Sequence, residues 1–253
     1  MKRASRVLAV LAVAILPGLS AAAEIKVAVA ANFNGTLQKL AGMYKAASGH
    51  TLVLSAGSSG ALTTQIVNGA PFDVFLSADS ARPEKLEADG LAVPGSRFVY
   101  ALGVPVLWSA SAGVVDGEGK VLREGSFRHL AIAEPRNAPY GAAAQQIMSK
   151  LGVWDALEAA GRVVKGNSIG QTHGQVASGA AELGFVALAQ IKGADGIPGS
   201  HWIPPADMYA PIAQAAVALK RADDPAAAAD FLAWLRSDAA ARKVIEDAGY
   251  GLE

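Results

Sequence analysis

The sequence predicts an α/β protein of two lobes, each a mostly parallel sheet flanked by helices. After Glu24, short apolar runs alternate with segments whose apolar residues recur at helical spacing. This is the pattern of a parallel sheet whose strands are joined by helices. Two longer apolar segments, residues 98–109 and 210–219, interrupt the alternation. We interpret them as paired crossover strands that pass from one lobe to the other and back and form a hinge.

The first part of the chain has a clear strand–helix order. Residues 25–30 are strand-like, and in residues 36–47 apolar side chains such as Leu37 and Leu40 share one helical face before a glycine ends the helix. The same criteria predict strands at residues 51–55 and 72–76 and helices at residues 61–67 and 83–88.

The order resumes later in the chain. We predict strands at residues 129–133 and 162–165 and helices at residues 140–151, 172–177, 226–236 and 239–248. Residues 114–125 are rich in glycine and polar side chains and predict a surface loop. The two crossover segments then assign residues 24–102 and 213–253 to lobe one and residues 103–212 to lobe two.

The composition excludes several classes of protein. Of the 253 residues 52% are hydrophobic and 17% charged, which allows a sizeable core and excludes intrinsic disorder. The 22 basic residues balance the 22 acidic ones and aromatic residues make up only 6%, so the features typical of nucleic-acid binding are missing. Because cysteine is absent, thiol catalysis, cysteine metal sites and disulfides are excluded.

Residues 1–23 have the three parts of an export signal: a basic start, an apolar stretch over residues 7–19, and three alanines before Glu24. The alternative is a membrane anchor, but spanning a bilayer needs about 20 apolar residues. There is also no cysteine to carry a lipid. We therefore expect a free, monomeric protein in the periplasm.

Small, hydroxyl and amide residues stand at four places where a predicted strand gives way to a helix. These junctions are residues 30–35, 56–60, 135–141 and 166–171. The first N–H groups of a helix lack partners, and with the helix dipole they attract anions. Because ligands of open α/β sheets bind at the carboxyl ends of strands, the junctions predict an anion site. The alternative is ordinary helix capping, which favours the same residue types.

The second and third junctions are the most informative. Ser58 and Ser59 lie between glycines, which let a ligand approach the backbone closely. Pro139 at a helix start leaves the amides of Tyr140 and Gly141 free. The four junctions contain no carboxylate, and the first, second and fourth contain no lysine or arginine. An anion there would be held by neutral donors, so a fully ionised dianion fits better than an anion that carries a proton.

An enzyme would need a nucleophile and a base, and neither occurs in an established pattern. Residues 57–61 resemble a nucleophile elbow but end in alanine instead of glycine. The four histidines are isolated from one another, and no P-loop or GxGxxG motif occurs. Asp73 and Asp79 flank a strand, and we interpret Asp79 as a helix cap or hinge partner. We expect no catalysis, no cofactor and no site for a metal cation.

Seven segments together carry a more specific pattern. They are residues 30–33 (AANF), 55–60 (SAGSSG), 69–79 (GAPFDVFLSAD), 138–141 (APYG), 180–186 (AAELGFV), 198–202 (PGSHW) and 248–251 (AGYG). With this combination the chain resembles the periplasmic molybdate-binding proteins of ABC transporters. The resemblance covers essentially the whole chain after the export signal. It implies a type II periplasmic binding protein fold whose two lobes close on a tetrahedral oxyanion.

The resemblance also implies a ligand, partners and site residues. The ligand would be molybdate, and also tungstate, delivered to a membrane permease that a cytoplasmic ATPase drives. The residues implied as contacts are Asn32, Ser59, Tyr140 and Ile169, with Ala31 and Ser58 as additional candidates. The alternatives are a binding protein for another oxyanion, such as sulfate, and a periplasmic serine hydrolase.

Overall fold

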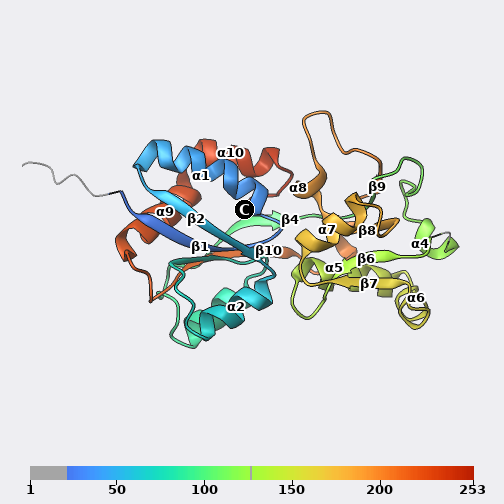
Figure 1. Ribbon diagram of the computed structural model, residues 1–253, viewed down its shortest axis with the longest axis horizontal. Helices are drawn as coiled ribbons and strands as arrows, with labels where there is room; N and C mark the ends of the chain where they lie inside the picture. The colour runs from blue at the N-terminus through green and yellow to red at the C-terminus, as the bar shows by residue number, and fades with distance from the viewer. Residues whose placement is uncertain (1–21, 126) are drawn as a thin grey trace, which may run out of the picture.

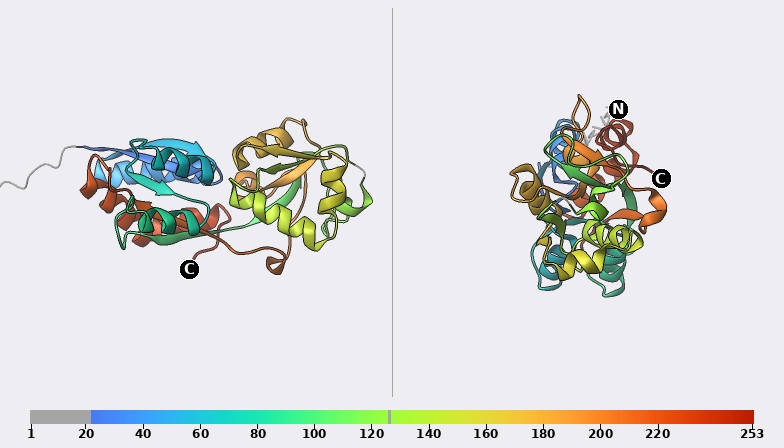
Figure 2. Two further views of the ribbon diagram at one scale, coloured as in Figure 1. Left: turned by 90° about the horizontal axis from the view of Figure 1, so that it is seen from below. Right: turned by 90° about the vertical axis from the view of Figure 1, so that its right-hand side faces the viewer.

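Two lobes lie side by side along the long axis of the molecule, each built around a five-stranded sheet (Figures 1 and 2). The computed structural model describes residues 22–125 and 127–253. The predicted export signal at residues 1–23 lies almost entirely outside the described residues. Among the described helices, none combines the length and apolar character needed to cross a membrane.

The first sheet has the strand order β2-β1-β3-β10-β4. Its strands are β1 (Glu24–Ala30), β2 (Thr51–Gly57), β3 (Val74–Leu76), β4 (Phe98–Gly103) and β10 (Ile212–Ala218). β1 pairs in parallel with β2 and β3, and β10 lies antiparallel between β3 and β4. Four of the five strands therefore run in one direction, and β10 runs against them.

The second sheet repeats this design with the order β7-β6-β8-β5-β9. Its strands are β5 (Pro105–Ser109), β6 (Leu130–Ala133), β7 (Val163–Gly166), β8 (Leu183–Ala187) and β9 (Ser200–Trp202). β6 pairs in parallel with β7 and β8, and β5 is antiparallel to both of its neighbours.

The prediction of mostly parallel sheets is confirmed, because in each sheet four strands run in the same direction and only one runs in the opposite direction. β10 and β5 are opposed because each enters its lobe from the hinge, whereas the parallel strands run towards it. The carboxyl ends of those parallel strands consequently face the other lobe. The predicted crossover segment at residues 98–109 is interrupted at Val104, between β4 and β5.

Helices cover both faces of the first sheet (Figure 1). α1 (Asn34–Ser48), α9 (Pro225–Ser237) and α10 (Ala239–Asp247) pack on one face through a single large apolar cluster. α2 (Ser59–Val67) and α3 (Ala81–Ala88) cover the other face. Full burial of a large apolar side chain stabilises the fold by about 1.5–3 kcal/mol, so these clusters hold the strand ends in place.

The second sheet is covered in the same way. α4 (Val121–Glu124), α5 (Pro139–Lys150) and α6 (Trp154–Ala159) lie on one face, and α7 (Ile169–Ala177) and α8 (Leu188–Ile191) on the other. A further cluster of mostly small apolar residues joins the two lobes where they meet.

The predicted surface loop at residues 114–125 is partly wrong. It contains α4, and Val115, Val121 and Leu122 are buried in the core of the second lobe. The prediction failed because the glycines and charged residues dominate the composition of this segment, while its apolar face spans only one helical turn.

Candidate functional site

A small cavity of about 10 Å³ lies where the facing strand ends of the two lobes meet. It is lined by Ala30, Ala31, Asn32, Gly57, Ser58, Ser59, Ala78, Ala138, Pro139, Tyr140 and Ile169. All six predicted site residues are in this set, and they come from all four junctions. No lining residue carries a charge. That these residues hold an anion remains a prediction.

At the first junction the backbone amide of Asn32 is available. The neighbouring amides are occupied, because Ala31 N–H donates to Gly57 O and Phe33 N–H to Ala30 O, both at 2.9 Å. Among the described residues, the Asn32 N–H has no acceptor. The Asn32 side chain is turned into lobe one. Ala31 therefore offers its methyl group to the cavity, and Asn32 offers its backbone N–H.

At the second junction the Ser59 hydroxyl is held in a defined orientation. The Ala78 N–H donates to Ser59 Oγ at 2.9 Å, which occupies an acceptor position of the oxygen and leaves its proton free to donate. Ser58 Oγ accepts a 3.4 Å hydrogen bond from Ala61 N–H and so caps α2. Ser59 is 1% exposed. Because α2 begins at Ser59, the backbone N–H of Ser59 is also one of the unpaired amides at the helix start.

The third and fourth junctions contribute helix starts from lobe two. α5 begins at Pro139, which has no N–H, and Tyr140 is the second helical residue. α7 begins at Ile169 behind the capping residue Ser168, whose Oγ accepts from Gln171 N–H. Within the described part of the chain, no acceptor contacts the N–H of Tyr140 or Ile169. The N-termini of α2, α5 and α7 thus converge on the cavity and give it a positive potential.

The Tyr140 side chain points away from the other donors. An added Cβ at Gly103, where β4 ends, would overlap the Tyr140 hydroxyl, so the two are in contact at the hinge. Burial raises the pKa of this hydroxyl well above its usual value of 10.0 and keeps it neutral. The group that Tyr140 offers to the cavity is therefore its backbone N–H.

The aspartates next to this region have structural roles. Asp79 Oδ1 accepts a 3.0 Å hydrogen bond from Arg82 N–H at the start of α3, and its other oxygen pairs with the Arg82 guanidinium. Asp73 accepts from Lys26 N–H and from Asp223 N–H. The prediction that Asp79 caps a helix is confirmed. Within the described residues no group of histidine, aspartate and glutamate could hold a metal ion.

Hydrogen bonds between the lobes surround the cavity. The Gly60 N–H donates to Asn137 O at 2.9 Å, and Arg82 Nη2 donates to Arg136 O at 3.0 Å. Both bonds join lobe one to the third junction of lobe two. The structure therefore shows the lobes closed over the cavity.

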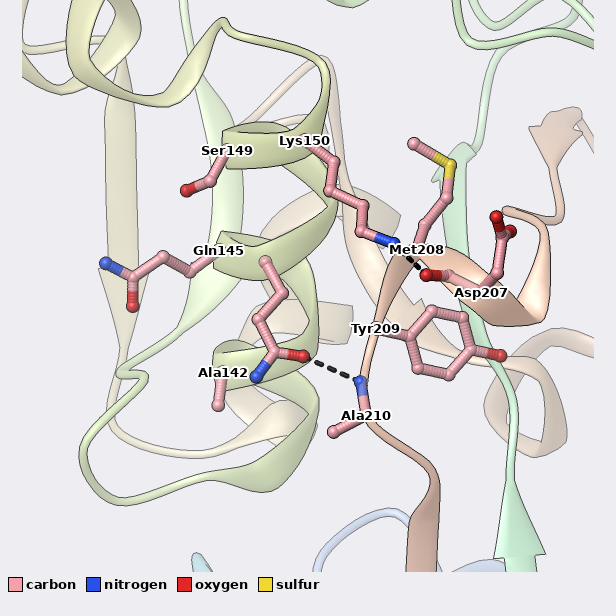
Figure 3. A pocket seen from close by; sticks show the side chains of 9 residues that line it. Ala142, Gln145, Ser149, Lys150, Asp207, Met208, Tyr209 and Ala210 are labelled. Atoms are coloured by element: carbon pink, nitrogen blue, oxygen red, sulfur yellow. Dashed lines mark hydrogen bonds between the residues drawn. The ribbon is translucent and has the colours of Figure 1, made fainter.

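A larger groove lies elsewhere, between α5 and residues 206–210 of lobe two (Figure 3). It has a volume of about 590 Å³ and opens to solvent. Lys150 Nζ donates to Asp207 O and Gln146 Oε1 accepts from Ala210 N–H, so two of its polar side chains are used within the protein. The groove contains none of the predicted site residues, so the smaller cavity between the lobes is the candidate site.

Sequence reasoning missed two residues behind the cavity. Asn32 Nδ2 donates to Gln214 Oε1 at 2.7 Å and to the Tyr250 hydroxyl at 3.1 Å. Tyr250 in turn donates to Asn32 O at 2.9 Å. The sequence does contain a sign of Gln214, since it is the one polar residue in the otherwise apolar strand IAQAAVA.

Comparisons with known proteins identify the family. The model of the bacterial extracellular solute-binding proteins matches residues 25–251. The chain belongs to this family. The molybdate-binding protein ModA of Azotobacter vinelandii is 47% identical to it over 250 residues, covering 98% of both chains. ModA of Rhodobacter capsulatus is 46% identical, over 96% of this chain and 95% of its own.

A solved structure agrees with this family assignment. The periplasmic molybdate-binding protein of Azotobacter vinelandii superimposes with a TM-score of 0.89 and 53% sequence identity. The match covers 90% of this chain and 99% of that one. The two-lobed fold predicted from the family resemblance is thereby confirmed.

Proposed function

We propose that this protein captures molybdate between its two lobes and delivers it to the membrane permease of an ABC transporter. Tungstate, which has the same shape and charge, is the second ligand. The protein acts as a monomer in the periplasm after residues 1–23 are removed, and a cytoplasmic ATPase drives uptake through the permease. The ModA relatives, 46–47% identical over nearly the whole chain, support this choice of ligand.

The observation that carries the proposal is the convergence of neutral donors from both lobes on one small cavity between them. Lobe one supplies Asn32 N–H and the Ser59 hydroxyl and amide, and lobe two supplies the N–H groups of Tyr140 and Ile169. Hydrogen bonds to a charged group contribute about 1.5–3 kcal/mol each. An anion bound first to lobe one would therefore draw the two helix starts of lobe two onto itself and favour closure.

The same geometry argues against hydrolysis. Ser59 would be the nucleophile, but no histidine, aspartate or glutamate lines the cavity to act as its base. His173 is stacked on the Trp108 ring at 5.5 Å, and His50 Nδ1 accepts from Ala23 N–H. We therefore propose reversible binding without turnover and without a cofactor.

Calorimetric titration with molybdate and with tungstate tests this function. We expect one anion per protein and a higher melting temperature, because a ligand at a thousandfold excess over Kd stabilises the native state by about 4 kcal/mol. A melting temperature that is unchanged in millimolar molybdate would contradict the proposal. Turnover of a chromogenic ester by the purified protein, abolished in Ser59→Ala, would support the hydrolase instead.

A further inference from the structure

A cluster of buried polar side chains lies directly behind the cavity, at the hinge. Its centre is Gln214 on β10, which is fully buried. Gln214 Oε1 accepts from Asn32 Nδ2 at 2.7 Å and from the Tyr100 hydroxyl at 3.3 Å. The single proton of the Tyr100 hydroxyl is shared with Ser77 O, which lies 3.1 Å away. Burying an amide is unfavourable unless it is hydrogen-bonded, so a glutamine retained in an apolar strand needs an explanation.

The position of Gln214 on the hinge is the second observation. β4 and β10 are the crossover strands of lobe one, and their pairing shifts register between Gln214 and Ala215, opposite Tyr100. Such bulges bend a strand and redirect its side chains. Here the irregularity turns Gln214 and Tyr100 towards each other, next to the place where the chain passes into lobe two.

The third observation is a set of polar atoms without partners. Gln214 Nε2 and the Tyr140 hydroxyl are both buried and, among the described residues, neither has a hydrogen-bond partner. The two groups lie on the same part of the hinge, because the Tyr140 hydroxyl contacts Gly103, which pairs with Ile212, two residues before Gln214 on β10. Leaving one such group unsatisfied costs about 1–3 kcal/mol. A donor from lobe one and a hydroxyl from lobe two are thus both buried and unpaired at the hinge.

We propose that Gln214 is a positioning residue that joins the anion-binding residues of the two lobes. Its Oε1 holds the Asn32 side chain and thereby fixes the amide that Asn32 offers to the anion. Closure of the lobes brings its Nε2 next to the Tyr140 hydroxyl, and the hydrogen bond between them, completed when the anion is bound, satisfies two buried polar groups at once. Gln214 touches no anion itself. This inference rests on the proposed function, since it assigns a role in the same binding event.

The test is a double-mutant cycle for molybdate affinity. Gln214→Met keeps the length of the side chain and removes both polar atoms, and Tyr140→Phe removes only the hydroxyl. We expect Gln214→Met to weaken binding by about tenfold and Tyr140→Phe by about threefold, because one hydrogen bond contributes about 0.5–1.5 kcal/mol. The double variant should bind no more weakly than Gln214→Met alone.

Gln175→Met is the matched control: Gln175 Oε1 is also buried without a partner among the described residues, but it lies on α7 away from the hinge. It should bind like the wild type.

Each result decides the inference. Wild-type affinity in Gln214→Met, with only a lower melting temperature in the absence of anion, would show a purely structural residue and overturn the proposal. Strictly additive losses would overturn the link between the lobes. If Gln214→Met does not fold, wild-type affinity in Tyr140→Phe overturns that link by itself. A wild-type protein that binds no molybdate would instead contradict the proposed function, and the two failures are therefore distinguishable.

Discussion

At the residue scale, Ser59 shows how a neighbour can prepare a side chain for a ligand. The Ala78 N–H fixes the Ser59 oxygen, so the hydroxyl proton is directed elsewhere. Ser59→Ala removes this donor and leaves the Ala78 amide without its partner. We expect molybdate affinity to fall roughly ten- to hundredfold, the equivalent of about 1.5–3 kcal/mol, measured by calorimetric titration.

The control for Ser59 is a hydroxyl on the same helix outside the cavity. Thr63 Oγ1 donates to Ser59 O within α2, and Thr63→Val removes that hydroxyl while keeping the branched shape. Its affinity should stay within about twofold of wild type. Wild-type affinity in Ser59→Ala would mean that Ser58 carries the contact or that this junction only caps α2.

Glu182, far from the cavity, gives a second prediction at this scale. Burial alone would raise its pKa, but the Arg128 guanidinium and the His129 N–H, each at 2.9 Å, lower it from 4.5 to about 2. A depressed pKa stabilises the fold above the unfolded-state pKa, and this stability is lost as pH falls through the folded-state pKa. Glu182→Gln should therefore be less stable than wild type by about 1 kcal/mol at neutral pH, and the gap should close between about pH 4.5 and pH 2. Urea unfolding at several pH values measures it; a gap independent of pH would contradict the assignment.

At the scale of elements, periodicity located most strands and helices but placed two helix starts too late. α2 and α7 begin at Ser59 and Ile169, where apolar spacing predicted residues 61 and 172, whereas the start of α5 at Pro139 was predicted from the proline itself. Apolar spacing marks only the part of a helix that packs on a sheet. The first turn packs between the lobes instead, where Tyr140 and Ile169 belong to the apolar cluster that joins them, and Ser58 and Ser168 cap α2 and α7. That turn faces the cavity, so the residues nearest the candidate site gave the weakest periodic pattern.

The start of α5 depends on Gly141. A Cβ there would overlap the carbonyl oxygen of Ala133, at the end of β6, and lie 2.7 Å from its carbonyl carbon. Because these are backbone atoms, Gly141→Ala must push α5 away from the sheet and carry the Tyr140 amide with it. We expect at least a tenfold loss of molybdate affinity and a lower melting temperature.

Gly174→Ala is the control. Nothing lies within 4 Å of a Cβ added at Gly174 in α7, so this variant should stabilise the protein by about 0.5–1 kcal/mol. A Gly141→Ala protein that binds like the wild type would show that the third junction contributes no donor.

At the scale of the whole molecule, the sequence predicted two lobes and four junctions, but not how they meet. The convergence depends on the closed position of the lobes, which bonds such as Gly60 N–H to Asn137 O maintain. These contacts join residues far apart in the sequence and follow no periodic pattern. The buried partners of Asn32 were missed for the same reason, since Gln214 and Tyr250 reach it only through the folded hinge.

Selectivity among oxyanions is a property of the assembled cavity, and it should depend on protonation state first and on size second. The lining offers N–H groups and serine hydroxyls and no carboxylate acceptor. Hydrogen phosphate carries a proton that would face those donors unpaired, at a cost of about 1–3 kcal/mol, so it should bind far more weakly than molybdate at pH 7.

Sulfate is fully ionised and can be excluded only by its size. Donors held by rigid helix starts would leave each hydrogen bond to this smaller anion stretched. Competition titrations at pH 7 separate the two effects. Phosphate competing as well as molybdate would contradict a site made only of donors, whereas sulfate binding more tightly than molybdate would leave the anion cleft intact and change its ligand.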